Sequence, residues 1–323
     1  MIISQTPLRI SFMGGGTDFE DFYRRYPGRV LSTTIDKYIY LCANPKFDKT
    51  IRISYSKTEN VERREQIEHP LVKAALEEVG IEKGIEITSI ADIPAGGTGL
   101  GSSGSFSVGL LNTLYAFLKK YISPSVLAEK ACQIEINRAL SPIGRQDQYA
   151  TAFGGFNIIT FNCDGRVEVE PLYLTPSLKE DFKKHLLLFY TGLQRSSNLI
   201  LSKQKQNINK NFQFLKKMSE MTLIFRVALE KGNFEKLGKL LHQGWLIKKK
   251  LAPGISNPQI DKMYNLALKA GAWGGKILGA GGGGFILVMA SPKNQSEIKK
   301  KLNKYQLAPF NFTEAGSKIV FKG

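Results

Sequence analysis

Short apolar runs separated by turn residues dominate the first half of the chain. Their hydrophobic character predicts β-strands at five places: 8–12, 30–35, 38–42, 51–55 and 85–90. Before the last of these, residues 70–79 repeat apolar positions at helical spacing. The first half is therefore expected to be rich in strands.

The strand at 85–90 leads into a loop at 92–101 and then into a predicted helix at 102–121. The apolar residues of this helix recur at helical spacing: Val108, Leu111, Leu114, Tyr115 and Leu118. A strand, a glycine-containing loop and a helix in this order form an arrangement that binds anions, because a helix N-terminus presents N–H groups and a positive dipole end.

A second helix is predicted at 125–139, ending before Ser141-Pro142, and strands follow at 156–161 and 167–169. Residues 172–179 are the candidate boundary, since the strand at 186–190 gives way to long helices beyond them. We therefore expect two domains, one at 1–178 and the other at 179–323.

Long amphipathic helices characterise the second half, where they are predicted at 196–231, 234–250 and 258–270. The chain then closes with these segments: a short run at 274–278, a glycine run, a strand at 285–289, a helix at 295–305 and a strand at 317–321. Mixed elements of this kind indicate an α+β protein.

The composition is that of a globular protein with a basic balance. Of the 323 residues, 42% are hydrophobic and 23% are charged, which excludes a wholly disordered or fibrous chain. The net charge of +17 is compatible with nucleic-acid binding, with anionic small molecules or with a lysine-rich background. We assign most of it to solvated helix faces, on lysines such as Lys203, Lys205, Lys210, Lys216, Lys217, Lys248 and Lys249.

The cysteines and histidines form no metal or disulfide pattern. Cys42, Cys132 and Cys163 are odd in number and widely spaced, and the three histidines lie far from one another in the sequence. The first residues resemble a strand rather than a targeting signal, and no apolar run approaches the roughly 20 residues that span a bilayer. We expect a soluble, reduced, cytoplasmic protein.

Three glycine clusters adjoin predicted strands: the first at 14–16, the second at 96–104 and the third at 279–284. The second and third contain GxGxxG, but a helix stands where a dinucleotide-binding fold needs a strand ending in an acidic residue. Walker A and protein-kinase motifs are missing as well. Phosphate binding by backbone N–H groups still fits, with Ser102 and Ser103 either as helix caps or as Mg²⁺ ligands.

Three segments stand in order along the chain: PLRISFMGGGTD at 7–18, PAGGTGLGSSGS at 94–105 and KILGAGGGGF at 276–285. They resemble, in the same order, the substrate motif, the PxxxGLGSS phosphate loop and the C-terminal glycine motif of the GHMP kinases. That superfamily includes galactokinase, homoserine kinase, mevalonate kinase and phosphomevalonate kinase. The segment GRQDQY at 144–149 lies between the second and third motifs, so the resemblance covers nearly the whole chain.

Within the superfamily the chain is most similar to a group of heptose kinases that carry GGGTD, IGxQDQYxxxFGG and FYTGxxR, found here at 14–18, 143–155 and 189–195. The resemblance implies an ATP-dependent kinase that phosphorylates O1 of D-glycero-D-manno-heptose 7-phosphate. The product, the 1,7-bisphosphate, would serve nucleotide-activated heptose biosynthesis for bacterial surface polysaccharide. Fucokinase-type domains share parts of this pattern and remain an alternative.

The resemblance also implies a two-domain α+β fold. Its N-terminal domain would be like domain 2 of ribosomal protein S5, its C-terminal domain would be helical and ferredoxin-like, and ATP and Mg²⁺ would lie between them. The expected partner is a small sugar phosphate rather than nucleic acid or a membrane, and a homodimer stays open. A nucleic-acid-binding protein on this scaffold is the alternative from another class, although the chain has no RNP aromatic pair, zinc finger or arginine-rich arm.

Phosphoryl transfer needs a group that accepts the hydroxyl proton and cations that neutralise the phosphates. The resemblance places the base at Asp147 and sets Arg9 beside it, where a fixed charge keeps the aspartate ionised. It assigns Mg²⁺ to Ser103 and Glu135, with Glu129 as the rival of Glu135. From the residues alone, Asp147 also fits a turn or capping aspartate, Arg9 a strand-edge cation, and Glu135 a solvated helix face.

The remaining site residues also follow from the resemblance. ATP phosphates are assigned to the second cluster: Gly96, Gly97, Gly99, Leu100, Gly101, Ser102, Ser103 and Gly104. The sugar phosphate is assigned to Gly14, Gly15, Gly16, Thr17, Asp18, Arg145, Arg195, Gly281 and Gly282. Asp18 would accept sugar hydroxyls, and Arg145 and Arg195 are candidates for the 7-phosphate.

Many sugar kinases of the family have Glu-His where Gly15-Gly16 stand in this chain. The missing side chains should leave room for a bulkier sugar, which favours a heptose over galactose. Gly281–Gly284 would either let the second domain approach the site closely or form a purely structural turn.

Overall fold

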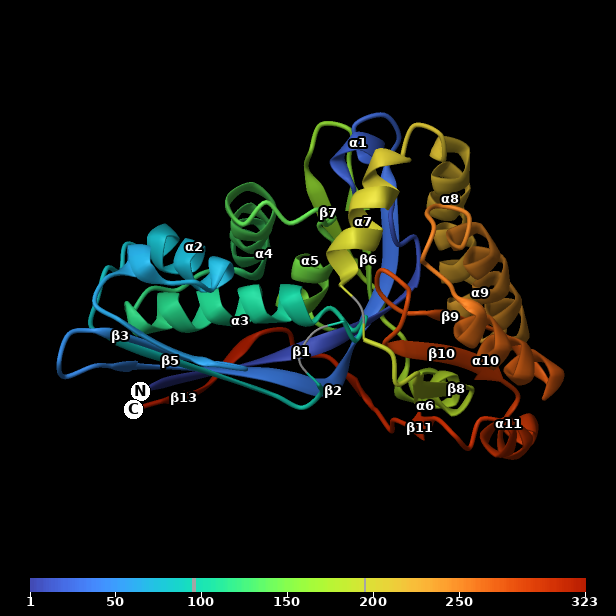
Figure 1. The fold of residues 1–323 in the computed structure, drawn as a ribbon. Coiled ribbons are helices and arrows are strands. Elements are labelled where there is room, and N and C mark those ends of the chain that lie inside the picture. The colour runs from blue at the N-terminus through green and yellow to red at the C-terminus, as the bar shows by residue number, and fades with distance from the viewer. Residues whose placement is uncertain (95–96, 195) are drawn as a thin grey trace.

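The computed structural model describes residues 1–94, 97–194 and 196–323. Two long strands, β1 (Ile2–Met13) and β2 (Gly28–Pro45), pair antiparallel and form the centre of the first sheet (Figure 1). The other strands of this sheet are β3 (Ile51–Ser54), β4 (Thr58–Val61), β5 (Ile85–Ala91), β6 (Asn157–Phe161), β7 (Val167–Pro171), β12 (Phe312–Thr313) and β13 (Lys318–Lys322). Because β2 pairs with β6 through its first residues and with β5 through its last, one strand joins the two parts of the sheet.

Several helices accompany the first sheet: α1 (Glu20–Tyr23), the 3-10 turn η1 (Arg64–Gln66), α2 (Pro70–Val79), α3 (Ser102–Phe117), α4 (Pro124–Cys132), the π-helical turn η2 (Gln133–Arg138) and α5 (Gln146–Phe153). Helix α3 packs on β1 and β2. Its predicted stripe of Val108, Leu111 and Leu114 is fully buried against them, so the hydrophobic spacing in the sequence identifies the face that contacts the sheet.

The second sheet has the order β11 (Gln306–Leu307), β8 (Leu186–Tyr190), β10 (Phe285–Ala290) and β9 (Ala272–Ile277). Its accompanying helices are α6 (Pro176–Lys184), α7 (Ser197–Gln206), α8 (Phe212–Glu230), α9 (Phe234–Lys248), α10 (Pro258–Lys269), the 3-10 turn η3 (Pro292–Asn294) and α11 (Gln295–Lys301). Helix α9 packs on β9, and α8 packs on α9. Among the described residues, none of the helices has the length and apolar character needed to traverse a membrane.

A shared hydrophobic core joins the two sheets. The ring centroid of Phe12 on β1 lies 5.2 Å from that of Phe182 on α6 and 5.8 Å from that of Phe225 on α8. Aromatic pairs of this kind each contribute about 0.5–1.5 kcal/mol beyond their buried area. Strand β1 is thus held by both parts of the molecule, and its residues 9–13 lie where the parts meet.

The chain enters the second sheet after β7 and returns to the first sheet at its end. Strand β13 pairs with the start of β1, and the amide of Gly323 donates to the carbonyl of Met1 at 2.9 Å. Figure 1 shows both termini at the end of the first sheet that is remote from α8 and α9. The expected domain boundary at 178/179 falls inside α6 and stays a prediction.

The predicted helix at 196–231 is wrong, since α7 and α8 are separate helices. The break falls in a segment with three asparagines, a residue type that favours helix ends over helix interiors. Asn207 is the C-cap of α7, and Asn211 precedes α8 and donates its amide to the carbonyl of Leu251 at 2.7 Å.

The predicted strands at 30–35 and 38–42 form one strand, β2, because Asp36 and Lys37 continue its extended backbone. The proposed boundary at 172–179 contains the start of a helix that the sequence interpretation missed. Pro176 is the first residue of α6, and Thr175 caps the helix by accepting a hydrogen bond from the amide of Leu178. Proline is favourable at a first helical position because no N–H is needed there.

Candidate active site

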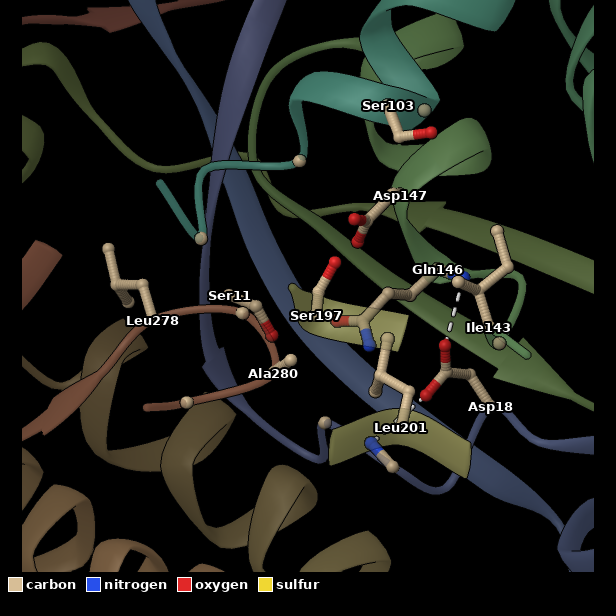
Figure 2. A pocket seen from close by; sticks show the side chains of 18 of the residues that line it. Ser11, Asp18, Ser103, Ile143, Gln146, Asp147, Ser197, Leu201, Leu278 and Ala280 are labelled. Atoms are coloured by element: carbon tan, nitrogen blue, oxygen red, sulfur yellow. Dashed lines mark hydrogen bonds between the residues drawn. The ribbon is translucent and has the colours of Figure 1, made fainter. Parts of the chain in front are cut away.

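A cavity of about 210 Å³ opens where the two sheets meet (Figure 2). Its walls come from segments that are far apart in the sequence: the end of β1, the second glycine cluster, the starts of α3 and α5, helix α7 and the third glycine cluster. Figure 2 shows Asp147 and Ser103 on one side, Ala280 on another, and Asp18 with Leu201 on a third.

The second and third glycine clusters touch through their backbones. A Cβ atom at Gly99 would overlap the carbonyl oxygen of Leu278, and one at Gly279 would lie 2.5 Å from Cα of Gly99. Both residues also have positive φ. Glycine is required at this contact because any side chain would separate the two segments.

Helix α3 begins at the cavity, with Gly101 as its N-cap. Neither neighbouring serine caps the helix: Ser102 Oγ lies 3.0 Å from Thr98 Oγ1, and Ser103 Oγ donates to Glu135. The first N–H groups of a helix lack partners within it, and its dipole is positive at this end. This end of α3 therefore suits a phosphate.

Most of the second cluster lines the cavity, namely Gly97, Gly99, Gly101, Ser102, Ser103 and Gly104. Leu100 is instead buried in the hydrophobic core beneath the loop. Gly96 was also predicted to bind phosphate and lies outside the described residues.

Arg9 and Asp147 form a bidentate pair at the cavity wall. Nε of Arg9 donates to Oδ1 of Asp147 at 2.8 Å and Nη2 donates to Oδ2 at 2.7 Å, while Nη1 donates to the carbonyl of Gly99 at 2.6 Å. The side chain of Arg9 is 3% exposed and that of Asp147 is 26% exposed. The fork fixes the carboxylate while leaving part of it accessible to the cavity.

Glu135 lies on the π-helical turn η2 and meets Ser103. Its carboxylate accepts a hydrogen bond from Ser103 Oγ at 2.5 Å and one from Gln148 Nε2 at 2.7 Å. Burial raises the pKa of Glu135 to about 7. Glu129 instead pairs with Arg145 and does not line the cavity, so the structure favours Glu135 over its rival.

The hydroxyl of Ser103 and the carboxylate of Glu135 supply oxygen atoms at the cavity wall. Mg²⁺ prefers such oxygens in small number, completed by phosphate oxygens and water. Residues 1–94, 97–194 and 196–323 contain no group of three or more His, Cys, Asp or Glu that could hold a metal ion. An ion bound here would therefore depend on a phosphate ligand.

Asp18 is buried on the third side of the cavity. Its Oδ1 accepts from the amide of Gly16 at 3.0 Å and its Oδ2 from the amide of Gln146 at 3.1 Å (Figure 2). Burial, with the nearby charge of Asp147, raises the pKa of Asp18. Gly144 permits this approach, since a Cβ atom there would overlap Oδ2 of Asp18.

The first glycine cluster forms a tight turn next to Asp18. The hydroxyl of Thr17 donates to the carbonyl of Gly14 at 2.8 Å and stays buried, so Thr17 has a structural contact. A Cβ atom at Gly14 would overlap the carbonyl oxygen of Arg29, which excludes any side chain there. Neither Gly14 nor Thr17 lines the cavity.

Gly15 and Gly16 do line the cavity, but the space beside them differs. The nearest atoms to a Cβ at Gly15 are 3.9 Å away, whereas one at Gly16 would overlap Nε2 of Gln204 on α7. The space that the sequence predicted for a bulkier sugar is thus present beside Gly15. Beside Gly16 the side-chain amide of Gln204 fills the corresponding space.

The structure does not bring Arg145 into the cavity lining. Its guanidinium pairs with Glu129 and donates to the carbonyl of Gly165 at 3.1 Å. Gly281 lines the cavity, whereas Gly282 does not and donates its amide to the carbonyl of Ile255 at 2.8 Å. The other predicted phosphate ligand, Arg195, lies outside the described residues.

Two buried lysines line the cavity, and the sequence interpretation missed both. Lys248, the last residue of α9, is 5% exposed and donates to the carbonyl of Gly279. Its assignment to a solvated helix face is wrong, because the end of α9 points into the cavity wall. Lys276 on β9 donates to the carbonyls of Ser11 and Phe12 at 2.8 and 3.2 Å.

Burial lowers the pKa of Lys248 to about 8, helped by Arg9 and opposed by Asp18 and Asp147. Burial also lowers the pKa of Lys276, and its charged neighbours Lys248 and Arg9 act in the same direction. A signal existed for Lys276, which stands as a single charge in an apolar strand before the third cluster. No such signal marked Lys248, because it is the first of three consecutive lysines and resembles a residue of a charged helix end.

Uncharged polar side chains complete the lining near Asp18. The buried hydroxyl of Ser11 has no hydrogen-bond partner among the residues that the structure describes. The side chains of Gln146 and Gln204 lie on the same side of the cavity. Buried polar groups are normally paired, so Ser11 suits a ligand with hydroxyl groups.

Comparison with protein families matches both parts of the chain. Residues 68–155 match the model described as the GHMP kinases N terminal domain, and residues 225–306 match the model described as GHMP kinases C terminal. Together the two matches include more than half of the chain. They contain Asp147 and the third glycine cluster.

Similar proteins include several sugar kinases. A D-glycero-alpha-D-manno-heptose 7-phosphate kinase of Campylobacter jejuni is 29% identical over 98% of each chain. The crystal structure of a D-glycero-D-manno-heptose 1-phosphate kinase from Bacteroides thetaiotaomicron superposes with a TM-score of 0.83 at 26% identity, covering 100% of both chains. A galactokinase of Pyrococcus furiosus is 26% identical over 96% of this chain and 95% of its own.

Proposed function

Since this chain belongs to the GHMP kinases, and is an ATP-dependent sugar kinase with the two-domain fold of that family, we propose that its substrate is D-glycero-D-manno-heptose 7-phosphate. It transfers the γ-phosphate of ATP to the anomeric O1 and releases the 1,7-bisphosphate for nucleotide-activated heptose biosynthesis. The relatives from Campylobacter and Bacteroides support the heptose, although their names place the phosphate at different positions.

The observation that carries this proposal is the Arg9–Asp147 fork, which stands between the start of α3 and Asp18. Phosphoryl transfer needs a hydroxyl in line with the γ-phosphate and a carboxylate to take its proton. The α3 end suits the phosphates of ATP, and the Asp18 side suits the sugar. Asp147 lies on the wall between these two sides.

Transfer of the phosphoryl group makes one bond at phosphorus and breaks another. A bond forms between O1 of the sugar and the γ-phosphorus, the bond from that phosphorus to the β,γ-bridging oxygen breaks, and its electron pair leaves with ADP. The O1 proton moves to Asp147, whose orientation the Arg9 fork fixes. Mg²⁺, held by Ser103 and Glu135, would neutralise charge on the ATP phosphates when bound.

The sugar hydroxyls would meet Asp18, Ser11, Gln146 and Gln204. Asp18 accepts hydrogen bonds, and the hydroxyl and amides can both donate and accept. Gly15 leaves space beside this set. Arg195 remains the sequence-based candidate for the 7-phosphate, and the protein is expected in the cytoplasm, with a homodimer left open.

A panel of sugars in a coupled ADP-release assay tests the substrate. Heptose 7-phosphate should give the highest kcat/KM, above unphosphorylated heptose, fucose, galactose and mevalonate. Highest turnover of fucose would replace the proposal by a fucokinase-like activity, for which relatives in Arabidopsis thaliana and Bacteroides fragilis are 26% and 28% identical.

The base assignment has its own test. Asp147→Asn keeps the shape of the side chain and is expected to lower kcat by about 1,000-fold, because no carboxylate accepts the proton. Asp164→Asn, an exposed aspartate paired with Arg166, is the matched control and should leave kcat unchanged. Full turnover by the Asp147→Asn variant would exclude Asp147 as the base.

A further inference from the structure

The transferred phosphoryl group needs cations, and the second glycine cluster supplies none. Residues 94–105 contain neither lysine nor arginine. Kinases that bind nucleotides through other loops place a lysine at the phosphates. Arg9 lies close by, but two of its nitrogens are engaged by Asp147. A further cation in the cavity could therefore bind the transferred phosphoryl group, a role that no residue of the second glycine cluster fills.

Lys248 stands at the required place. It donates to the carbonyl of Gly279, and Arg9 donates to the carbonyl of Gly99. The backbones of these two glycines are in contact, since a Cβ atom on Gly279 would lie 2.5 Å from Cα of Gly99. Lys248 and Arg9 thus donate to the two backbone segments that form this contact. Both side chains line the same cavity as Asp147.

Lys248 forms no ion pair within the described residues, and the charges of Asp18 and Asp147 act on it only from a greater distance. Its hydrogen-bond partner there is a neutral carbonyl, and no carboxylate of residues 1–94, 97–194 and 196–323 forms an ion pair with it. A buried ammonium without a paired anion is costly. An ammonium also has three N–H donors, so the site is suited to an anionic ligand.

We propose that Lys248 binds the γ-phosphoryl group of ATP and stabilises the charge on its oxygens during transfer, acting with Arg9 across the contact of the second and third glycine clusters. The cation is supplied by the C-terminal part of the chain to a phosphate bound by the N-terminal part.

Lys276 has a different role in this scheme. It donates to the carbonyls of Ser11 and Phe12, which hold the end of β1 against β9. It also lacks the acidic neighbours Asp18 and Asp147 that favour the charged form of Lys248. Lys276 is therefore a positioning residue, and Lys248 is the catalytic cation.

The proposal rests on the proposed roles of Arg9 and Asp147 but not on the identity of the sugar. Its test measures kcat, KM for sugar and ADP affinity in Lys248→Met and Lys248→Arg, with whichever sugar of the panel the wild type phosphorylates fastest. Lys248→Met should lower kcat by about 100-fold, while KM for sugar and the Kd of ADP, which lacks the γ-phosphate, change less than about threefold. Lys249→Met, the half-buried neighbour paired with Asp261, is the matched control and should match wild type.

Parallel measurements with a phosphorylated and an unphosphorylated sugar distinguish the two anions that an ammonium could bind. Equal losses of kcat on both support contact with the γ-phosphoryl group. A rise in KM confined to the phosphorylated sugar would assign Lys248 to the sugar phosphate and overturn the proposal, as would an unchanged kcat. If the Met variant fails to fold, Lys248→Arg decides: it should retain activity at pH 7 and lose the wild-type decline of kcat/KM for ATP above about pH 8, and a retained decline would contradict the proposal.

Discussion

Two arginine–carboxylate pairs flank the start of α5, and they differ in what they leave accessible. Arg9 holds Asp147, whose carboxylate is 26% exposed at the cavity, whereas Arg145 holds Glu129 beside Gly165 and outside the cavity lining. Both arginines belong to family-like motifs: Arg9 was predicted to lie beside Asp147, and Arg145 to contact the 7-phosphate. The comparison shows that a motif gives the position of a residue in the chain but not the direction of its side chain.

Their partners account for the difference. Arg145 is the N-cap of α5 and is held by Glu129 and the carbonyl of Gly165, whereas Asp147 is the second residue of the helix and is held by Arg9. Arg145 thus braces the start of the helix that carries Asp147.

The largest effect is expected when the Arg9–Asp147 pair is broken. Arg9→Met removes the fork on Asp147 and a cation from the cavity, and we expect kcat to fall by about 1,000-fold, equivalent to about 4 kcal/mol of transition-state stabilisation. Steady-state kinetics with ADP release, alongside a thermal melt, measures this. Arg9→Lys should recover only part of the rate because a lysine cannot form the fork; complete recovery would count against bidentate orientation.

Raising the pH should distinguish Lys248 from both arginines. Arginines stay charged at any accessible pH, whereas the pKa of Lys248 is about 8. In the free enzyme the ammonium is present below that pH and lost above it, so kcat/KM for ATP should decline up to about tenfold per pH unit above pH 8. The charged groups facing Lys248 are Arg9, Asp18, Asp147 and Lys276.

The matched variant for that profile is Lys248→Arg, in which the alkaline decline should disappear. A pH–rate profile from pH 6 to 10, with enzyme stability checked at each end, measures it. An identical decline in both enzymes would assign the ionisation to another group.

A smaller effect, on stability rather than rate, is expected from the second pair. Arg145→Met leaves the carbonyl of Gly165 and the carboxylate of Glu129 without their partner, and should lower the free energy of unfolding by about 2 kcal/mol. The value is reduced because Glu129 is 42% exposed. Urea unfolding measures it, and kcat of the folded enzyme should stay within about threefold; a loss of kcat as large as that of Arg9→Met would return Arg145 to the active site.

Glu129→Gln should have the smallest effect. The amide keeps the hydrogen bond from Tyr149 and lies partly in solvent, so the free energy of unfolding should change by less than about 1 kcal/mol. Neither kcat nor the magnesium dependence of the rate should change. A raised magnesium requirement here, and not in Glu135→Gln, would reverse the choice between the two glutamates.

The sequence predicted the parts of this fold that depend on local pattern. Val108, Leu111 and Leu114 identified the buried face of α3, and the three glycine clusters marked the cavity walls. The break between α7 and α8 was missed because the asparagines at 207–211 depend on partners elsewhere, such as the carbonyl of Leu251.

The candidate site divides in the same way. Arg9, Asp147, Asp18, Ser103 and Glu135 were named from motifs, and the structure brings them to one cavity. Lys248 was assigned to solvent because an amphipathic pattern cannot tell which end of a helix meets another part of the chain. Its burial depends on Gly279, 31 residues away.

Strand β1 carries Arg9, yet one of its edges is covered by β13, which is about 300 residues further along the chain. During synthesis, that edge stays unpaired until nearly all of the described chain has been made. An unpaired strand edge can pair with other chains. The arrival of residues 318–322 therefore completes the pairing of the strand that bears Arg9.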